Sequence, residues 1–430
     1  MTFSRRQFIQ AIGAGGAALV LGGCATNGVR KASSAHVIVV GGGSGGATAA
    51  KYLRKFGPDL KVTLIEPKAT YHTCYGSNWV IGGLRGIDDI AQTYGALKDK
   101  HGVNVVQDSV TGIDAEARRV TLAGGQMLSY DRLVVSPGIG FRWSAAAEGT
   151  SEAMFDRVPH AWKAGPQTAL LRKQLEAMPD GGVFVMVAPG NPFRCPPGPY
   201  ERASLVANYF KQYKPKSKIM ILDNKEKFSK QGLFMEGWKA NYGDMIEWVP
   251  SSLGGQIDRV DVASRTCYSD GGLNEFKADV LNYIPPQMAG DIAQRAGLTD
   301  EFGWCPVDQL SFKSRIHPNI HVIGDSCVAG AMPKSGHSAN SQGKMVAAAI
   351  VNELDGRGMV APTMVNTCYS LITPEWGISV AAVYQFSGES IKGVPGSGGV
   401  SPSEAGKEFR KLEALYTRGW YASITNDIWG

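Results

Sequence analysis

Short apolar runs, each followed by turn residues, recur along the chain. Residues 36–40 read His-Val-Ile-Val-Val, and Gly-Gly-Gly-Ser-Gly-Gly follows them directly. Small and apolar residues over 47–56 then fit a helix, and a second apolar run covers 62–65. Short apolar runs bounded by turn residues are typical of strands buried in a parallel sheet. The pattern therefore predicts a strand–turn–helix–strand unit that opens an α/β domain.

Further apolar runs divide the chain into two interleaved groups. Residues 133–138 (Leu-Val-Val-Ser-Pro-Gly) and 320–325 (Ile-His-Val-Ile-Gly-Asp) continue the first pattern, and a helix of small residues follows over 338–352. Between them, 183–187 and 219–222 predict strands of a separate sheet. Because the first group flanks the second, we expect the second domain to interrupt the first.

The glycine turn carries a dinucleotide-binding signature. Gly41, Gly43 and Gly46 form a GxGxxG motif that contains Ser44, and Glu66 lies 20 positions beyond the last glycine. The three glycines permit a tight turn, close approach of the backbone to a pyrophosphate, and close packing of helix on strand. Helix N–H groups favour the pyrophosphate, and the acid accepts hydrogen bonds from the adenosine ribose. The strand, the helix and the acid occur at the spacing that the motif requires. This spacing disfavours the alternative that the glycine turn binds no ligand.

Two later turns favour FAD as the dinucleotide. Pro137 lies in the turn after one strand, and Gly324 and Asp325 end another. Asp325 is expected to bind the ribityl chain. The segment from Lys334 opens a helix whose N-terminus is expected to face the pyrimidine end of the flavin and stabilise negative charge there.

The second domain lacks a corresponding glycine motif. After its first strand, the loop over 188–199 contains five prolines around Cys195. Proline has no backbone N–H and fixes φ, so this loop is poorly suited to hold a pyrophosphate. We therefore expect that the NAD(P)H site is lost and that electrons enter from another donor.

The expected fold class is α/β, with two Rossmann-like domains of the glutathione-reductase type, the first split by the second. A C-terminal region is expected to cover the flavin or meet a partner. The expected segments are a signal over 1–35, an FAD domain over 36–147 and 288–359, a second domain over 148–287, and the C-terminal region over 360–430.

Composition excludes several classes of protein. The 430 residues are 43% hydrophobic and 19% charged, the balance of a folded globular protein. The net charge of +6 is not clustered, which argues against a nucleic-acid binder. No apolar run is long enough for a transmembrane helix, and no Cys-x-x-Cys-His motif indicates haem on this chain. His36, His72 and His337 lack metal-ligand spacing, and no metal site is predicted.

The N-terminus is typical of a twin-arginine export signal. Arg5 and Arg6 precede a Gly/Ala-rich apolar run over 11–23. Two processing alternatives stay open: Leu-Gly-Gly-Cys24 resembles a lipobox that leaves Cys24 lipidated, and small residues over 32–35 offer a cleavage site. Removing the first 35 residues takes away four basic residues and no acids, which lowers the charge from +6 to +2. A periplasmic protein loaded with a cofactor is expected.

Several segments together resemble a known family. They are Tyr-His-Thr-Cys74-Tyr-Gly, Arg-Cys195-Pro-Pro-Gly-Pro-Tyr-Glu201, the Gly-Asp325 turn, Met-Pro-Lys334-Ser-Gly and Asn-Thr-Cys368-Tyr. The chain resembles the flavoprotein subunit of flavocytochrome c sulfide dehydrogenase, within the wider group that includes sulfide:quinone reductases. The resemblance extends over nearly the whole chain from His36.

The resemblance implies roles for five residues. Cys74 resembles the cysteine that holds FAD covalently through its 8α-methyl group. Cys195 and Cys368 resemble a redox-active disulfide beside the flavin, Glu201 an acid near that pair, and Trp420 an aromatic near the flavin. Sulfide would be oxidised at the disulfide, and electrons would pass through FAD to a separate c-type cytochrome subunit.

The expected chemistry suits the residue types. A disulfide accepts a sulfur nucleophile by exchange, which leaves a persulfide and a thiolate. Arg194 would favour that thiolate and Glu201 could accept a proton. Structural alternatives stay open: Cys74 as a buried small residue, Cys195–Cys368 as a structural disulfide, Glu201 as a capping carboxylate and Trp420 as packing.

Two rival functions stay open as well: a membrane-associated sulfide:quinone reductase and a non-catalytic flavoprotein that transfers electrons. A charged helix predicted over 404–416, with Phe409, Leu412 and Tyr416 on one stripe, is too polar to favour membrane insertion. Three cysteines have no assigned role, and one pair among them is a candidate bridge: Cys267, Cys305 and Cys327.

Overall fold

A five-stranded parallel sheet carries the glycine turn. The computed structural model describes residues 34–430, and the predicted export signal with Arg5, Arg6 and Cys24 lies outside the described residues. The strand order is β20 (Ile320–Val322), β9 (Arg132–Val135), β1 (His36–Val40), β2 (Lys61–Ile65) and β5 (Asn104–Val106). The central strand β1 pairs in parallel with β2 and β9, and its valines and isoleucine are buried on both faces. Since β20 comes from late in the chain, two distant stretches build this sheet.

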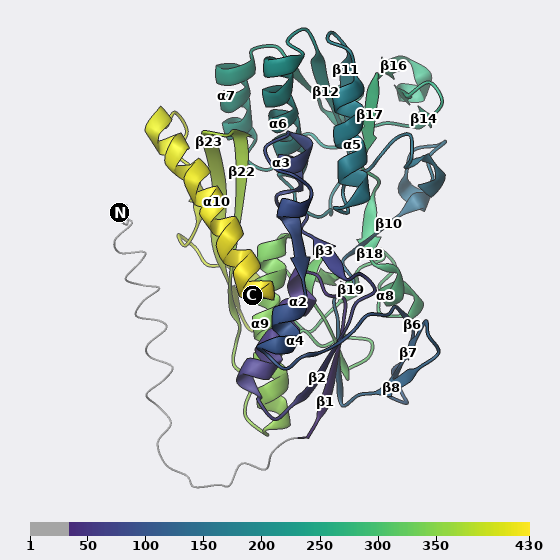
Figure 1. The fold of residues 1–430 in the computed structure, drawn as a ribbon, viewed down its shortest axis with the longest axis vertical. Coiled ribbons are helices and arrows are strands. Elements are labelled where there is room, and N and C mark those ends of the chain that lie inside the picture. Colours follow the sequence, from purple (N-terminus) through teal and green to yellow (C-terminus); the bar gives the residue numbers. More distant parts are fainter. Residues whose placement is uncertain (1–33) are drawn as a thin grey trace. The chain divides into compact units, whose positions relative to one another are not determined.

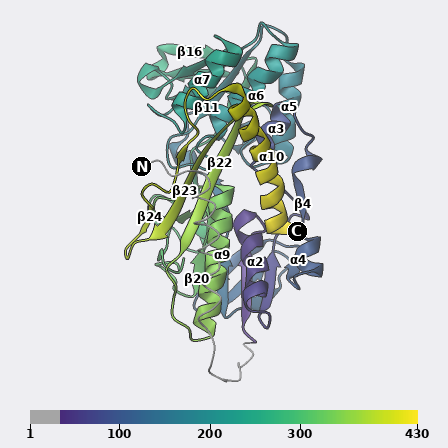
Figure 2. The same cartoon turned by 90° about the vertical axis from the view of Figure 1, so that its left-hand side faces the viewer.

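Two helices pack tightly beside this sheet. Helix α2 (Ser44–Phe56) begins directly after the glycine turn, and α9 (Gly336–Leu354) lies alongside it (Figure 2). Gly343 permits the close approach, because a Cβ there would lie 2.7 Å from the carbonyl oxygen of Gly45. At the beginning of α9, the Ser335 hydroxyl caps the helix by accepting the Ser338 N–H at 3.0 Å.

A second parallel sheet, formed by residues from the middle of the sequence, lies at the opposite end of the described structure from the first sheet (Figure 1). Its order is β13 (Ile246–Val249), β12 (Lys218–Asp223), β11 (Val183–Ala188) and β17 (Val280–Tyr283). Helices α5 (Pro166–Ala177), α6 (Gly198–Tyr213) and α7 (Gln231–Tyr242) accompany it. The sequence of this sheet lies between β9 and β20 of the first. Two Rossmann-like domains, the first interrupted by the second, agree with the predicted α/β class.

Short antiparallel elements complete the two domains. Strands β10 (Ile139–Phe141) and β18 (Gln287–Ala289) pair where the chain leaves and re-enters the first domain. The others form small antiparallel sheets: β3 (Thr70–His72) with β4 (Ala91–Thr93), β6 (Val110–Asp114) with β7 (Arg119–Leu122) and β8 (Met127–Ser129), and β14 (Arg259–Asp261) with β15 (Thr266–Ser269) and β16 (Asn274–Lys277).

The C-terminal region is a hairpin covered by a long helix. Strands β22 (Thr363–Thr373) and β23 (Trp376–Phe386) pair antiparallel, and α10 (Lys407–Trp429) packs against them (Figure 2). Gly377 allows this contact, because a Cβ there would lie 2.4 Å from the Ala414 backbone nitrogen.

Helix α10 corrects the prediction of a short helix over 404–416. It begins at Lys407 and continues to Trp429. On the predicted stripe, Leu412 and Tyr416 are exposed, as expected for a surface helix. Arg410 is buried instead, where it pairs with Glu236 at 2.9 Å. The face of α10 that packs on the protein therefore contains a buried ion pair. None of the helices in residues 34–430 is both long and apolar enough to cross a membrane.

Candidate functional site

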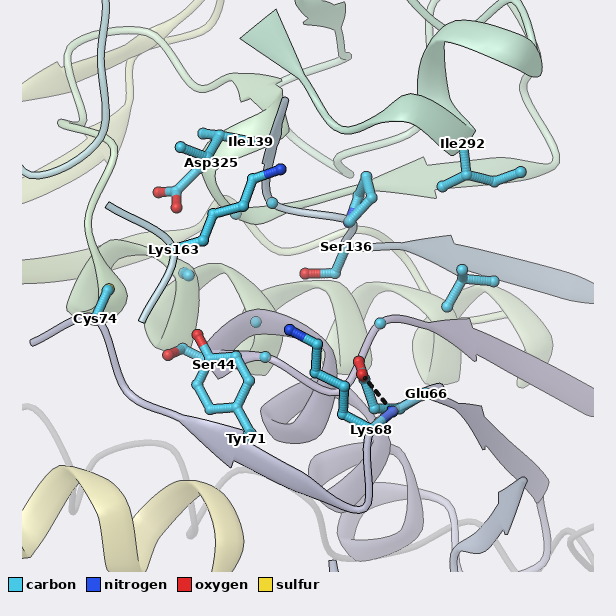
Figure 3. Close-up of a pocket in the computed structure, with 18 of the residues that line it drawn as sticks. Ser44, Glu66, Lys68, Tyr71, Cys74, Ser136, Ile139, Lys163, Ile292 and Asp325 are labelled. Atoms are coloured by element: carbon cyan, nitrogen blue, oxygen red, sulfur yellow. Dashed lines mark hydrogen bonds between the residues drawn. The ribbon is translucent and has the colours of Figure 1, made fainter. Parts of the chain in front are cut away.

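A pocket of about 390 Å³ opens at the carboxyl ends of the first sheet's strands, where α/β folds bind ligands. Figure 3 shows Glu66 and Lys68 at one end of it and Cys74 at the other. Most of the predicted cofactor residues line it: Gly41, Gly43, Ser44, Glu66, Cys74, Pro137, Gly324 and Asp325. Three predicted residues do not: Gly46, Lys334 and Trp420. Lys163 lines it although no sequence motif marked it, and Tyr71, the first residue of the Cys74 segment, lines it although no role was predicted for it.

The glycine turn has the geometry of a phosphate cradle. Gly41 has a φ of +97°, and a Cβ there would lie 2.4 Å from the Ser136 carbonyl oxygen. A Cβ on Gly46 would lie 1.8 Å from the Gly41 carbonyl oxygen, so only glycine permits this packing of helix on strand. Glu66 is fixed by two backbone donors, the N–H of Gly42 at 2.8 Å and that of Lys68 at 3.0 Å. Figure 3 shows Glu66 next to Lys68.

Asp325 indicates that the part of the pocket away from Glu66 suits a polar ligand. Its Oδ1 atom is buried and has no hydrogen-bond partner among residues 34–430. Its Oδ2 lies 3.7 Å from Arg194 Nη1. Burial raises the pKa of this carboxyl, while Arg194 and Lys334 lower it. Because a buried carboxylate oxygen requires a donor, a ligand hydroxyl such as one of a ribityl chain would satisfy it. The residues present therefore fit FAD.

Cys74 is half-buried in the pocket wall. Burial raises the pKa of its thiol, and the Arg194 guanidinium opposes that shift. The neighbouring Tyr75 hydroxyl lies 3.1 Å from Ser44 Oγ. Trp420 stacks edge-on against the Tyr75 ring at 5.4 Å and so supports the Cys74 segment without lining the pocket.

Cys195 is held in the proline loop in an unusual conformation. Its φ is +59°, a left-handed value that is uncommon outside glycine. Its N–H donates to the Lys334 carbonyl oxygen at 2.8 Å. The thiol lies against the N-terminus of α6, because a Cβ on Gly198 would be 3.1 Å from Cys195 Sγ. Burial and then the nearby Cys368 raise the pKa of the Cys195 thiol, while Arg194 lowers it.

Cys368 comes from strand β22 and lies near enough to Cys195 to raise the pKa of that thiol. Asn366 Nδ2 donates to its Sγ at 3.4 Å. Burial raises the pKa of the Cys368 thiol, and Asn366 and Lys230 oppose the rise. Both Cys195 and Cys368 are free thiols in the structure, so the disulfide between them stays a prediction.

The remaining described cysteines lie away from this pair. Cys305 and Cys327 are direct partners where β19 (Cys305–Pro306) runs beside β21 (Cys327–Val328), and Cys267 is isolated in β15. All three are buried free thiols in the structure, so the bridge considered among them stays a prediction. Lys334 donates to the backbone carbonyls of Asp325 and Cys327, at 2.8 and 2.9 Å. It therefore holds the Asp325 turn in place from behind the pocket wall.

Glu201 is buried in the first turn of α6. It accepts hydrogen bonds from Asn78 Nδ2 and the Leu371 N–H, both at 3.0 Å, and from Trp79 Nε1 at 3.4 Å. Burial nevertheless raises the pKa of this carboxyl. The sequence contained no signal for Asn78, which joins Glu201 to the buried Arg202. In residues 34–430 no cluster of three or more metal-ligating side chains occurs.

The second sheet ends in an acid whose hydrogen-bonding capacity is already used. Asp223, the last residue of β12, is fully buried and accepts from Tyr200 at 2.6 Å and Trp248 at 2.9 Å through Oδ2. Lys225 lies 2.5 Å from its Oδ1. The carboxylate at this strand end is thus engaged by protein donors rather than exposed to a nucleotide.

The fold and the pocket define a two-domain flavoprotein of the disulfide-oxidoreductase type. A family model described as pyridine nucleotide-disulphide oxidoreductase matches residues 35–162. The solved structure of the sulfide:quinone oxidoreductase from Aquifex aeolicus superposes with a TM-score of 0.72 and 20% identity. That superposition covers 91% of this chain and 92% of the Aquifex chain, which shows a common fold.

Two further models narrow the class. One, for the central part of the sulfide dehydrogenase [flavocytochrome c] flavoprotein chain, matches residues 168–285, and one for the flavin-binding part of flavocytochrome c sulphide dehydrogenase matches 360–429. The sulfide dehydrogenase [flavocytochrome c] flavoprotein chain of Chlorobaculum thiosulfatiphilum is 61% identical over 44 residues, 10% of this chain and 92% of the relative. The sulfide-quinone reductase of Aquifex aeolicus is 27% identical over 155 residues, 36% of this chain and 35% of the relative's length. The chain belongs to this group of flavoproteins, which unites flavocytochrome c sulfide dehydrogenases and sulfide:quinone oxidoreductases.

Proposed function

We propose that this protein is a periplasmic sulfide dehydrogenase flavoprotein that passes electrons from sulfide through FAD to a separate c-type cytochrome subunit. The observation that carries the proposal is that Cys195, Cys368 and Glu201 lie near one another and near Arg194, which lines the pocket. These two cysteines are 173 positions apart in the sequence, and the fold brings them near each other and near a buried carboxyl. That combination suits attack of a sulfur nucleophile on a disulfide.

The residues of the chain divide the work between holding FAD and handling sulfur. Gly41, Gly43 and Glu66 would bind the adenosine diphosphate part, Asp325 the ribityl chain, and Cys74 would attach the flavin covalently. FAD, when bound, accepts two electrons and releases them one at a time.

The sulfur chemistry takes place on the cysteine pair. Hydrosulfide attacks one sulfur of an oxidised Cys195–Cys368 pair, breaks the S–S bond, and leaves a persulfide on one cysteine and a thiolate on the other. When H₂S is the attacking form, Glu201 accepts the proton. Burial and the nearby Cys368 raise the pKa of the Cys195 thiol well above its ordinary value, and Arg194 opposes that rise only in part.

The electron donor and acceptor are parts of the same proposal. We propose that NADPH and NADH do not serve as donors, supported by the proline loop and the engaged carboxylate of Asp223. A cytochrome acceptor is supported by the two flavocytochrome c models, which match the second domain and the C-terminal region. Quinone is the second candidate acceptor, favoured by the exposed Leu412, Leu415 and Tyr416 on α10 and by the name of the Aquifex relative.

Anaerobic mixing tests the donor and the acceptor together. Sulfide should bleach the bound flavin within the mixing time of a rapid-kinetics instrument, whereas NADH should not. Reoxidation by cytochrome c should then be faster than by a water-soluble quinone. Faster reoxidation by quinone would favour quinone as the acceptor. If sulfide fails to bleach the flavin, both sulfide-oxidising functions are wrong and a non-catalytic flavoprotein is favoured.

The covalent link has its own test. In wild type, yellow fluorescence should stay with the polypeptide after denaturing electrophoresis, and Cys74→Ala should release all of it. Cys267→Ala serves as a matched control, because that buried cysteine lies in a separate sheet and should leave the flavin attached. Release of FAD from wild type by acid precipitation would contradict the assignment.

A further inference from the structure

Lys230 is a buried lysine whose ammonium has only neutral partners. It precedes α7, and its Nζ donates to the Cys368 carbonyl oxygen at 3.0 Å and to Ser370 Oγ at 2.9 Å. The Phe234 ring lies 5.6 Å from the same nitrogen. Within residues 34–430 no carboxylate oxygen lies within 4 Å of it, in contrast to Lys225, which pairs directly with Asp223. A buried charge is unfavourable unless an opposite charge is near. Glu201 acts on this ammonium from beyond ion-pair distance, and within the described residues no anion contacts it directly.

The backbone at Lys230 is also strained. Its φ of +62° lies in the left-handed region, where a residue with a long side chain is uncommon. Glycine would adopt this conformation without a penalty, but glycine has no ammonium to offer. The strain is therefore tolerated where the fold places a positive charge beside strand β22. Such outliers are a reason to look for a functional role.

The anion that would complete the site is the thiolate of Cys368. Burial lowers the pKa of Lys230 to about 8, and of the groups that raise it again Cys368 is the largest, ahead of Glu201 and Cys195. The relation is reciprocal, since Lys230 lowers the pKa of the Cys368 thiol. Cys368 ionises only when the cysteine pair is reduced. The positive charge on Lys230 can therefore be balanced by a Cys368 thiolate only when the cysteine pair is reduced.

The other groups around Cys368 do not supply a comparable positive charge. They come from every element that packs on β22, namely Glu201 of α6, Cys195 of the preceding loop, His337 of α9, Tyr384 of β23 and Glu413 of α10. Burial lowers the pKa of His337 to about 4, so its ring is neutral near pH 7. The rest are acids or phenols that oppose a thiolate when ionised. Lys230 is accordingly the cation that faces Cys368 in the described structure.

We propose that Lys230 is a positioning residue that makes Cys368 the leaving thiolate, which directs hydrosulfide to the sulfur of Cys195. Hydrosulfide forms a new S–S bond to Cys195 while the Cys195–Cys368 bond breaks, and its electron pair leaves on Cys368. The products are a persulfide on Cys195 and a thiolate on Cys368, with the single negative charge of hydrosulfide conserved. A thiol of lower pKa leaves faster, so the ammonium selects which cysteine departs. This inference rests on the proposed function, and it deepens that function by assigning the two cysteines different roles.

The test measures the ionisation of Cys368 without using sulfide. The full-length holoprotein carrying Cys195→Ser is treated with iodoacetamide from about pH 5 to about pH 10, and modification of the Cys368 peptide is followed by mass spectrometry. Adding Lys230→Gln keeps the hydrogen-bonding capacity but removes the charge. The alkylation rate of Cys368 near pH 7 should fall by roughly tenfold or more, because loss of one nearby buried charge has at least this effect. Lys230→Arg should restore most of the rate.

Lys227→Gln is the matched control, because it removes the same charge three positions away from an exposed side chain. Its alkylation profile should match that of the parent. An unchanged profile in Lys230→Gln would overturn the proposal even if sulfide turnover were lost. If Lys230→Gln fails to fold, Lys230→Met and Lys230→Arg are compared instead. The proposal is overturned if Cys368 in Lys230→Met is alkylated as in the parent. It is also overturned if Lys230→Arg lowers the alkylation rate as much as Lys230→Met does. A further outcome is that sulfide fails to reduce the flavin of the wild-type protein while Lys230→Gln still shifts the alkylation profile of Cys368. That result would support the role of Lys230 and reject only the proposed function.

Discussion

The two parallel sheets share a topology but use their strand ends differently. After β1, glycines leave the backbone open, and the Glu66 carboxylate at the end of β2 lines a pocket. After β11, prolines close the loop, and Asp223 at the end of β12 is engaged by Tyr200, Trp248 and Lys225. The proline loop instead places Arg194 in the wall of the first domain's pocket, with Cys195 next to it in the chain. One loop is thus suited to bind a nucleotide and the other to place a thiol.

Removing either cysteine of the pair should have the largest effect on the rate of flavin reduction by sulfide. Cys195→Ser or Cys368→Ser should slow flavin reduction by sulfide by roughly a thousandfold or more, because the covalent route is removed, while FAD stays bound. Stopped-flow absorbance of the flavin measures this, with Cys267→Ala as the control that retains activity. Normal turnover in either serine variant would show that the loop has no redox role.

A smaller effect is expected at the acid of α6. Glu201→Gln should slow reduction by about a hundredfold, the usual size of a lost general base. Because burial raises the pKa of Glu201, the wild-type rate should fall as pH drops through that raised pKa, and the variant should lose this acidic limb. Glu116→Gln, on an exposed loop, is the control.

Stability offers a check on the same carboxyl that does not depend on activity. A carboxyl whose pKa is raised on folding contributes stability at pH below its unfolded pKa, and that contribution disappears as pH rises through the raised value. The melting temperature of wild type relative to Glu201→Gln should therefore decrease with rising pH. A constant difference would show that the carboxyl is not perturbed.

The smallest effect concerns the first loop. Gly46→Ala should lower the melting temperature by several degrees, because its Cβ would overlap the Gly41 carbonyl oxygen. Flavin content per chain should fall with it. Gly95→Ala is the control, since nothing lies within 4 Å of a Cβ at that position. Equal flavin content and stability in both variants would mean that the glycine cradle is not needed as argued.

The sequence by itself determined the features that depend on neighbours along the chain. The strand, glycine turn, helix and acid of the first domain lie within 31 residues, from His36 to Glu66, so their spacing predicts the pocket wall directly. The proline loop likewise predicted a missing glycine cradle in the second domain. Backbone sterics and N–H groups decide both features, and these act over a few residues.

Only the tertiary structure decided how the distant side chains meet. Lys230 reaches Cys368 across 138 positions, and Asn78 reaches Glu201 across 123. The packed face of α10 follows a buried Arg410–Glu236 pair that its apolar spacing did not indicate. Burial and partner choice depend on which elements pack together, and a single polar residue leaves no periodic signal of that packing. The chemistry of the cysteine pair is therefore set by contacts that exist only after the domains have assembled.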